Sequence, residues 1–180
     1  SIEGVQTGRG NDSVMGSTGA NLIVTDLAND TVGSADTVQG NGGADTIVTG
    51  AGNDLIYYNP LASINAGTGT DTLVMSGEEI DMTTDSGVVR GIERIDLTAL
   101  EANHLTLNVT DVSQMGGAIT VVGGAGDEVT PLGTWTASGG LQQIGGTGPY
   151  YQLYTSGNNS IAVMQGVNVV GLNLAGNDTL

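Results

Sequence analysis

The sequence predicts an all-β protein built from short strands and tight turns. Large apolar residues recur at nine-residue intervals over the first part of the chain, with glycines at fixed offsets between them. Gly, Asn and Thr interrupt nearly every segment, so no long stretch carries the 3.6-residue period of an amphipathic helix. The 31 glycines among 180 residues suit turns that require positive φ angles.

The charge of the chain excludes several classes of partner. Nineteen acidic residues face only three arginines and no lysine, for a net charge of -16. Such a chain cannot displace counterions from nucleic acid, and no apolar run is long enough to insert into a membrane. We expect affinity for cations, which would relieve the self-repulsion. Because there is no cysteine, stability must come from burial, hydrogen bonds or metal; without the cation, the first 75 residues are candidates for disorder.

An acidic or amide residue marks a repeat in the first part of the chain. The spacing is nine residues, apart from a slip of six at 31–36 and a later shift: Asp12, Asn21, Asp30, Asp36, Asp45, Asp54 and Asp71. Two places after each marker comes an apolar residue, and Ile64 continues this series without a marker before it. We expect the series to face the core: Val14, Ile23, Val32, Val38, Ile47, Ile56, Ile64 and Leu73. Glycines two places before the marker supply the turns.

The best copies resemble the RTX nonapeptide G-G-x-G-x-D-x-U-x, a calcium-binding repeat in which U is a large apolar residue. These copies are GNGGADTIV (40–48), TGAGNDLIY (49–57) and AGTGTDTLV (66–74). The resemblance implies a right-handed parallel β-roll over residues 1–76, with two nonapeptides per turn. Loops 18 residues apart would stack on one edge and bind calcium between them. Calcium prefers six to eight oxygens, and bare glycine lets backbone carbonyls join the carboxylates as ligands.

The resemblance also implies a set of calcium ligands. They are Gly10, Asp12, Asp30, Asp36, Gly43, Asp45, Gly50, Gly52, Asp54, Gly67, Gly69, Asp71 and Asp178. The same-edge partners would be Asp12 with Asp30, Asp36 with Asp54, and Asp54 with Asp71. These loop pairs predict on the order of three to five calcium ions. The alternative is an acidic solvated surface of Asx-turns.

Some positions depart from the repeat. Asp45 should lie on the opposite edge, facing Ser63, and sites that involve Ser63 or Asn21 should be weak because neither residue is charged. We also expect the slip at 31–36 to break the stacking, so that the roll forms two short blocks.

Residues 77–170 predict an all-β companion that caps or extends the roll. Alternating apolar residues indicate strands over 87–100, 104–112, 118–129, 133–140, 150–157 and 159–174. A solenoid needs such a cap because its open end exposes apolar side chains and unpaired backbone. The segments 91–97, 103–107, 126–129, 133–135 and 151–157 resemble modules of large RTX adhesins secreted by Gram-negative bacteria.

The sequence offers no catalytic site, and we expect no enzyme. His104 is the only histidine, it has no cysteine to share a zinc ion, and no G-x-S-x-G motif accompanies it. The acidic pairs Glu78–Glu79 and Asp127–Glu128 are interpreted as solvated turns rather than as a glycosidase pair. A second cluster leaves two alternatives open, a calcium-assisted sugar platform or the core of the companion. It contains Trp135, Tyr150, Tyr151 and Tyr154.

The segment 171–180 begins another repeat, LAGNDTL, or a C-terminal signal. Asp178 would need a partner loop elsewhere, either in a longer chain or in a neighbouring copy bound head to tail. The resemblance implies a secreted bacterial surface protein that leaves the cell by type I secretion and folds in external calcium. Its role would be structural or adhesive, in a surface layer, filament or adhesin. The alternatives are a sugar- or peptide-binding adhesin domain, with surface glycans as partners, and the tail of a secreted enzyme.

Overall fold

The structure is a computed structural model, and it describes residues 3–26, 33–99 and 102–174. The chain divides into two compact units. The first comprises Ser1–Val74 with Thr84–Arg94, and the second comprises Met75–Thr83 with Ile95–Leu180. Within the described ranges, no helix is long and apolar enough to cross a membrane.

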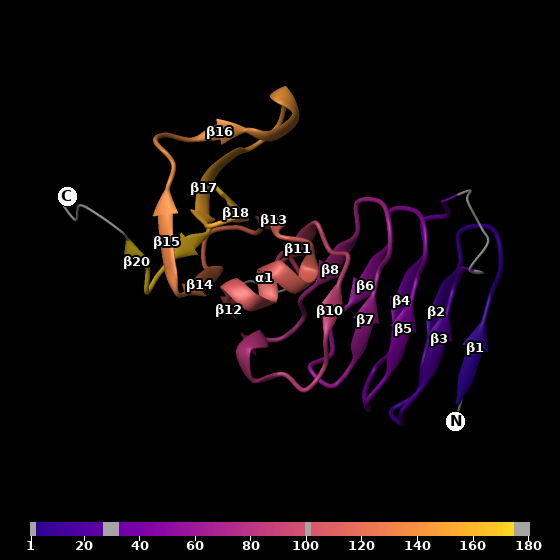
Figure 1. Cartoon of the computed structure of the whole chain (residues 1–180). Coiled ribbons are helices and arrows are strands. Elements are labelled where there is room, and N and C mark those ends of the chain that lie inside the picture. The colour runs from indigo at the N-terminus through magenta and orange to yellow at the C-terminus, as the bar shows by residue number, and fades with distance from the viewer. Residues whose placement is uncertain (1–2, 27–32, 100–101, 175–180) are drawn as a thin grey trace. The chain divides into compact units, whose positions relative to one another are not determined.

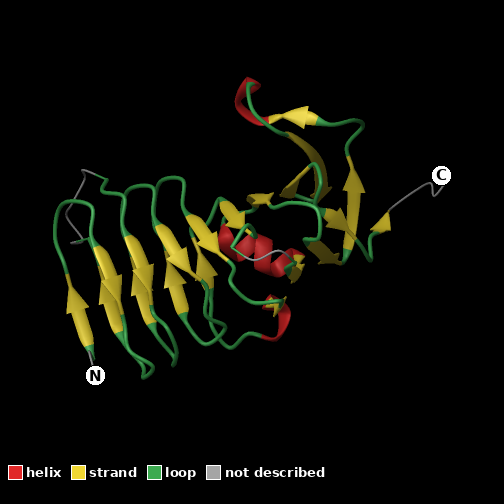
Figure 2. Cartoon of the chain, turned by 180° about the vertical axis from the view of Figure 1, so that it is seen from behind, coloured by secondary structure: helices red, strands yellow, loops and turns green. Residues whose placement is uncertain are grey.

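The first unit is a roll of parallel strands. Its strands β1 to β8 alternate between two sheets, so the chain coils from one sheet to the other (Figures 1 and 2). One sheet contains, in order, β1 (Gly4–Gln6), β3 (Leu22–Val24), β5 (Thr46–Val48), β7 (Ser63–Asn65) and β10 (Val89–Arg90). The other contains β2 (Ser13–Met15), β4 (Thr37–Gln39), β6 (Leu55–Tyr57) and β8 (Thr72–Val74). The predicted all-β fold with a parallel β-roll is confirmed.

The central residue of each strand from β2 to β8 belongs to the buried core of the roll. Successive side chains of a strand point to opposite faces, so only this residue turns inward. The predicted apolar series is buried in every described member, with at most 9% of the side chain exposed: Val14, Ile23, Val38, Ile47, Ile56, Ile64 and Leu73. Val32 lies outside the described residues.

The six-residue slip does not divide the roll. Val14 of β2 pairs with Val38 of β4, and Ile23 of β3 pairs with Ile47 of β5, so both sheets run through the slip without a break. The extra residues belong to the connection between β3 and β4, outside the ladders. Extra length in a connection between strands costs little free energy, whereas a break in the ladder would leave backbone groups unpaired. The prediction of two blocks is therefore wrong.

The second unit is also largely parallel. Its four-stranded sheet has the order β19 (Asn168–Val169), β14 (Glu128–Leu132), β12 (His104–Asn108) and β9 (Glu79–Asp81). A further ladder joins β13 (Ala118–Val122) in parallel to β18 (Asn159–Met164), which is antiparallel to β17 (Tyr150–Ser156). The remaining elements are β11 (Arg94–Asp96), which begins at the end of the first unit, β15 (Thr134–Ala137), β16 (Gln142–Gln143), β20 (Asn173–Leu174), and the 3-10 turns η1 (Met82–Thr84) and η2 (Ile144–Gly146).

A helix replaces part of the strand predicted over 104–112. Strand β12 ends at Asn108, and α1 (Val109–Met115) follows. The Asn108 side chain accepts hydrogen bonds from the backbone of Thr110 and Asp111, while the Asp111 carboxylate accepts one from the Asn108 backbone. This reciprocal capping box satisfies N–H groups that the first turn of a helix leaves without partners. The prediction of a continuous strand is wrong for residues 109–112.

Candidate metal sites

Four aspartates form a hydrogen-bonded ladder along one edge of the roll. We call Asp12, Asp36, Asp54 and Asp71, each directly before a strand of the β2–β8 sheet, the aspartate ladder. Each of the first three donates its backbone N–H to Oδ1 of the next, over 2.9 Å in every case. The Asp71 N–H donates to Oε2 of Glu93, also over 2.9 Å. The ladder therefore places one carboxylate per turn at the same edge.

The second oxygen of each ladder carboxylate has no hydrogen-bond partner among the described residues. Oδ2 is buried in all four residues, and the exposed fraction is 1% for Asp36, 2% for Asp54 and 0% for Asp71. A buried carboxylate oxygen without a donor loses its hydration and gains nothing in return. Such oxygens need a proton or a cation.

Burial changes the acidity of the ladder. It raises the pKa of Asp71 from its ordinary 3.8 to about 7, against the opposing effect of the hydrogen bond from the Asp54 backbone. The nearby carboxylates of Asp54 and Glu93 raise this pKa further. Burial likewise raises the pKa of Asp54, and the Asp36 and Asp26 charges add to the effect. In the absence of a cation, the ladder thus opposes its own full ionisation.

Glycines bring backbone carbonyls to the same edge. Gly52, Gly67 and Gly69 have φ angles of 138°, 93° and 142°. A β-carbon on Gly67 would overlap the carbonyl oxygen of Gly50, and one on Gly69 would overlap that of Gly52. Only bare backbone permits this approach between successive loops. The edge therefore combines buried carboxylate oxygens with closely packed carbonyls, which is the kind of donor set that calcium prefers.

The opposite edge of the roll is built differently. Asp45 Oδ1 accepts the Asn21 N–H over 2.8 Å, and Oδ2 accepts from Nδ2 of Asn59 over 3.4 Å. The same Asn59 amide donates to the Gly43 carbonyl over 2.9 Å. The Asn59 amide therefore contacts a carboxylate oxygen and a backbone carbonyl oxygen, which are the two kinds of ligand that a calcium ion would bind at this edge.

The residue that corresponds to Asp45 in the next turn is Ala62. Ser63 pairs with Thr46, one place after Asp45, so the predicted match of Asp45 with Ser63 is wrong by one residue. The step between the turns is 17 residues here because Ile47 pairs with Ile64. Ala62 is 1% exposed and has no oxygen in its side chain, so it offers this edge no carboxylate.

The register also corrects one predicted partnership. Asp12 donates to Asp36, 24 residues away, because the turn that contains the slip is longer. Asp30, which the sequence pairs with Asp12, lies outside the described residues, as does Asp178. The remaining predicted partners, Asp36 with Asp54 and Asp54 with Asp71, are adjacent members of the ladder.

The predicted ligands thus fall into two groups. Gly43 and Asp45 lie on the edge that Asn59 completes. The others that the structure describes lie in the loops of the ladder edge: Gly10, Asp12, Asp36, Gly50, Gly52, Asp54, Gly67, Gly69 and Asp71. Within the described part of the chain, no three acidic or histidine side chains group closely enough to hold a metal by themselves. Backbone carbonyls would therefore have to supply part of any coordination shell.

A family comparison identifies the repeat. The family model described as "RTX calcium-binding nonapeptide repeat (4 copies)" matches residues 6–34 and 32–59. Residues 6–59 are RTX calcium-binding repeats. The family assigns calcium as the ion, and the buried oxygens of the ladder fit it. Comparisons with curated proteins and with solved structures gave no significant match. The ladder continues past the matched RTX segment to Asp71 and Glu93.

Sequence reasoning missed two acidic residues at the RTX edge. Asp26 lies in the inserted connection, is 4% exposed, and accepts hydrogen bonds from Ser34 Oγ and the Ala51 N–H. The nine-residue period gives no signal for it. Glu93 stands two places after Gly91 and two places before the buried Ile95, which are the offsets of the repeat, so this signal was present, although the loop has one glycine and a glutamate in place of aspartate.

The proposed aromatic platform is contradicted for three of its four residues. Trp135 is 0% exposed, and Tyr151 and Tyr154 are each 8% exposed, so their ring faces cannot stack on a sugar. The Trp135 indole N–H donates to the Leu132 carbonyl over 3.2 Å. Only Tyr150 is exposed, to 48%. The core alternative is confirmed for the other three.

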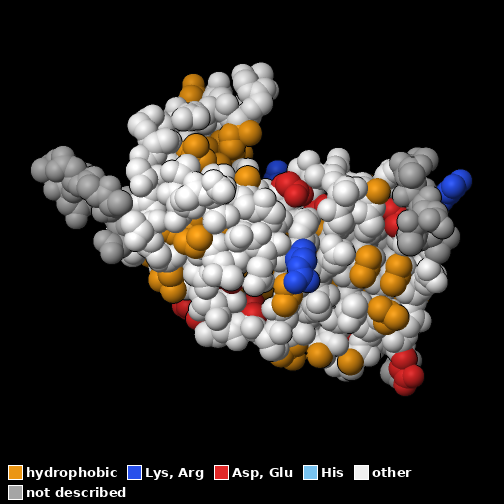
Figure 3. Space-filling view, in the orientation of Figure 1, with side chains coloured by type: hydrophobic (Ala, Val, Ile, Leu, Met, Phe, Trp, Pro, Cys, Tyr) orange, Lys and Arg blue, Asp and Glu red, His pale blue; other side chains and the backbone are white. Residues whose placement is uncertain are grey.

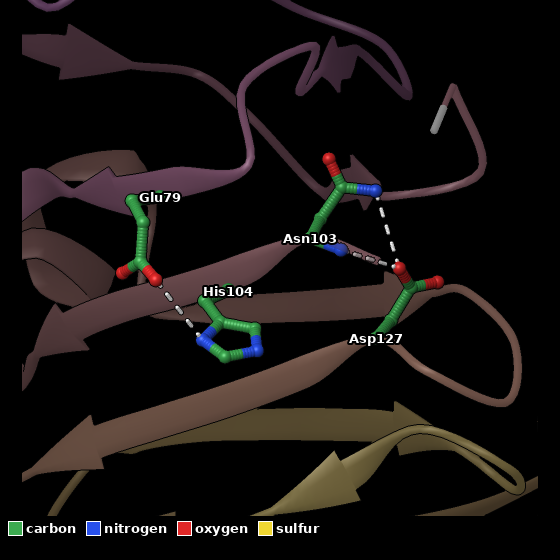
Figure 4. Close-up of polar contacts among 4 residues, drawn as sticks. All are labelled: Glu79, Asn103, His104 and Asp127. Carbon is green, nitrogen blue, oxygen red and sulfur yellow. Dashed lines mark hydrogen bonds and ion pairs between the residues drawn. The ribbon is translucent and has the colours of Figure 1, made fainter. Parts of the chain in front are cut away.

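The second unit contains an acidic residue that hydrogen bonds satisfy completely (Figure 4). Asp127 Oδ1 accepts the Asn103 backbone N–H over 2.9 Å and the Asn103 side-chain amide over 3.1 Å. Oδ2 accepts the Gly124 N–H over 2.7 Å. Asp127 is only 3% exposed, so its interpretation as part of a solvated turn is wrong. Nδ1 of His104 lies 3.4 Å from Oε1 of the exposed Glu79.

Proposed function

We propose that the chain is a calcium-dependent structural or adhesive module of a bacterial cell surface, secreted before it folds. The observation that carries this proposal is the buried Oδ2 of each ladder residue, which has no hydrogen-bond partner in the described ranges of the chain. Without calcium, several carboxylates must be buried together. With calcium, each ion cancels two charges and links neighbouring loops, so that binding energy becomes folding energy.

The acidity of the ladder supports a role outside the cell. RTX repeats are typical of secreted bacterial proteins, and a chain that calcium folds would stay extended where free calcium is scarce. Extended chains suit a type I secretion channel. External calcium would then fold the roll after export.

A structural role agrees better with the surface than a sugar-binding one does. Three of the four aromatic residues considered for sugar binding are buried. Among the described residues of the roll, three large apolar side chains are exposed, Met15, Leu22 and Leu61, and the face shown in Figure 3 is mostly polar with a few apolar spots over the roll. Binding to further copies or domains, through the repeat that contains Asp178, stays a prediction of the sequence, and so does the absence of catalysis.

Circular dichroism in chelator and in calcium tests the proposal. We expect a weak β signal in excess EGTA and a full one in millimolar calcium, with reversal on chelation. Magnesium at the same concentration is the control, because it binds with stricter octahedral geometry and keeps its water. Full β structure in chelator would refute calcium-driven folding. A glycan array probed in calcium should give no binding, and a specific hit would favour the ligand-binding alternative.

A further inference from the structure

The loop between β10 and β11 extends the ladder beyond the RTX segment that the family model matches. This loop contains Gly91, Ile92 and Glu93. Glu93 Oε2 accepts the Asp71 N–H over 2.9 Å, the same contact that Oδ1 makes in the preceding turns. The backbone N–H groups of Glu93 and Arg94 donate to the Asp71 carbonyl over 3.3 and 3.0 Å. Glu93 therefore takes the place of the next ladder aspartate.

The backbone of this loop covers the preceding one closely. Gly91 has a φ angle of 66°, and a β-carbon there would lie 2.7 Å from the Gly67 nitrogen and 2.9 Å from its carbonyl oxygen. Gly67 in turn lies against Gly50, so the column of bare backbone continues for one more turn. The new loop has three residues between its strands, whereas the loop before β8 has six, 66–71. The extra methylene of glutamate lengthens the side chain that reaches across from this shorter loop.

The oxygen that would complete the site is already buried. Asp71 Oδ2 has no partner among the described residues, and Asp71 is 0% exposed. Its carboxylate is held through Oδ1 by Asp54 on one side, while its backbone is held by Glu93 on the other. The Glu93 carboxylate, which is half-buried, belongs to the next loop of the same edge. A divalent cation between the two loops would compensate the buried charge of Asp71 and the charge of Glu93 together.

We propose that Asp71 and Glu93, with carbonyls of their two loops, hold a separate calcium ion that ends the ladder. The inference rests on the proposed calcium-dependent folding and adds a site formed by one loop outside the repeats. The competing interpretation is that Glu93 only accepts the hydrogen bond of the Asp71 N–H, which is the last backbone donor of the ladder, and binds no ion. Glu93→Gln separates the two because glutamine keeps an oxygen acceptor for the Asp71 N–H and removes the negative charge.

Calcium stoichiometry by isothermal titration calorimetry, checked by native mass spectrometry, tests the site. We expect Glu93→Gln to bind one calcium ion fewer than the unmodified chain. The matched control Glu78→Gln, an exposed acid with the same charge change, should bind the full number. An unchanged number in Glu93→Gln would overturn the inference and leave Glu93 as a cap. If the unmodified chain bound no calcium at all, the proposed function itself would fail.

A second variant covers a loss of folding. If circular dichroism showed Glu93→Gln unfolded even in saturating calcium, Glu93→Asp would decide, since it keeps the carboxylate and shortens its reach. One weakened ion among otherwise unchanged ions would support the site. Unchanged affinity for every ion would overturn it.

Discussion

Replacing Asp71 by asparagine should have opposite effects with and without calcium. The substitution keeps Oδ1, which accepts the Asp54 N–H over 2.9 Å, and replaces the partnerless Oδ2 by an amide NH₂. Without calcium, it removes a charge that the buried site opposes. With calcium, it removes a candidate ligand. We therefore expect Asp71→Asn to stabilise the metal-free roll and to weaken calcium binding.

The size of the first effect follows from the acidity of Asp71. Its pKa is raised from 3.8 to about 7, and at about 1.4 kcal/mol per pKa unit this corresponds to roughly 4 kcal/mol at pH 8. An amide N–H that found no acceptor would reduce the gain by about 1–3 kcal/mol. The net gain is then roughly 1–4 kcal/mol, or about five- to a thousandfold in the ratio of folded to unfolded protein.

The raised pKa of Asp71 also determines how the stabilisation by Asp71→Asn depends on pH. A carboxyl whose pKa is higher in the folded chain binds its proton more tightly there, so the metal-free roll gains stability as pH falls from about 7 towards 4. The advantage of Asp71→Asn should accordingly be full above pH 7 and vanish near pH 4. Calcium competes with the same proton, so its affinity should fall over this range.

The fraction of folded protein in calcium-stripped buffer, followed by circular dichroism at pH 8 and pH 4.5, measures the effect. Glu78→Gln serves as the charge-matched control on an exposed residue and should behave like the unmodified chain. An Asp71→Asn protein that is no more folded than the unmodified chain in chelator at pH 8 would refute the reasoning. So would an advantage that grows on acidification.

Three further substitutions test the rest of the structure. Asn59→Asp should bind one calcium ion more than the unmodified chain by calorimetry. In chelator it should destabilise the roll by about 5 kcal/mol, because a second carboxylate would lie about 3.4 Å from that of Asp45. An unchanged calcium stoichiometry would contradict this prediction. Gly69→Ala should cost roughly 3 kcal/mol or more in saturating calcium through overlap with the Gly52 carbonyl and a φ of 142°, whereas Gly8→Ala, with open space around it, should cost little. Trp135→Ala should lower the free energy of unfolding in urea, measured in saturating calcium, by about 3–5 kcal/mol without changing the number of bound calcium ions. Loss of an ion would argue against a purely structural role of Trp135.

The strands and turns of the roll could be predicted because they depend on local order in the sequence. An apolar residue two places after each acidic position marks the inward side chain, and this rule held for every described member, from Val14 to Leu73. The capping box of Asn108 and Asp111 is also a local pattern that favours a helix, but the alternating apolar residues before it favour a strand, and the sequence prediction followed the alternation. Local patterns of this kind need no knowledge of neighbouring turns.

The register could not be predicted in the same way. Stacking compares turns, and a turn of the roll spans 17, 18 or 24 residues according to its connections. Counting in steps of nine therefore paired Asp12 with Asp30, and Asp45 with Ser63. The sequence also left open whether the aromatic cluster is buried, because a tryptophan suits a core as well as it suits a binding surface.

The least predictable property is which buried aspartates need calcium. Asp45 belongs to GNGGADTIV, one of the best copies of the repeat, yet both its carboxylate oxygens accept hydrogen bonds, one of them from Asn59, which lies outside the period. Asp127 is satisfied in the same way through Asn103. Asp71 belongs to AGTGTDTLV, an equally good copy of the repeat, and keeps a buried oxygen without a donor from the described residues. A side-chain amide supplied from another turn separates the two cases, so we expect that counting copies of the motif overestimates the calcium sites wherever such an amide is present.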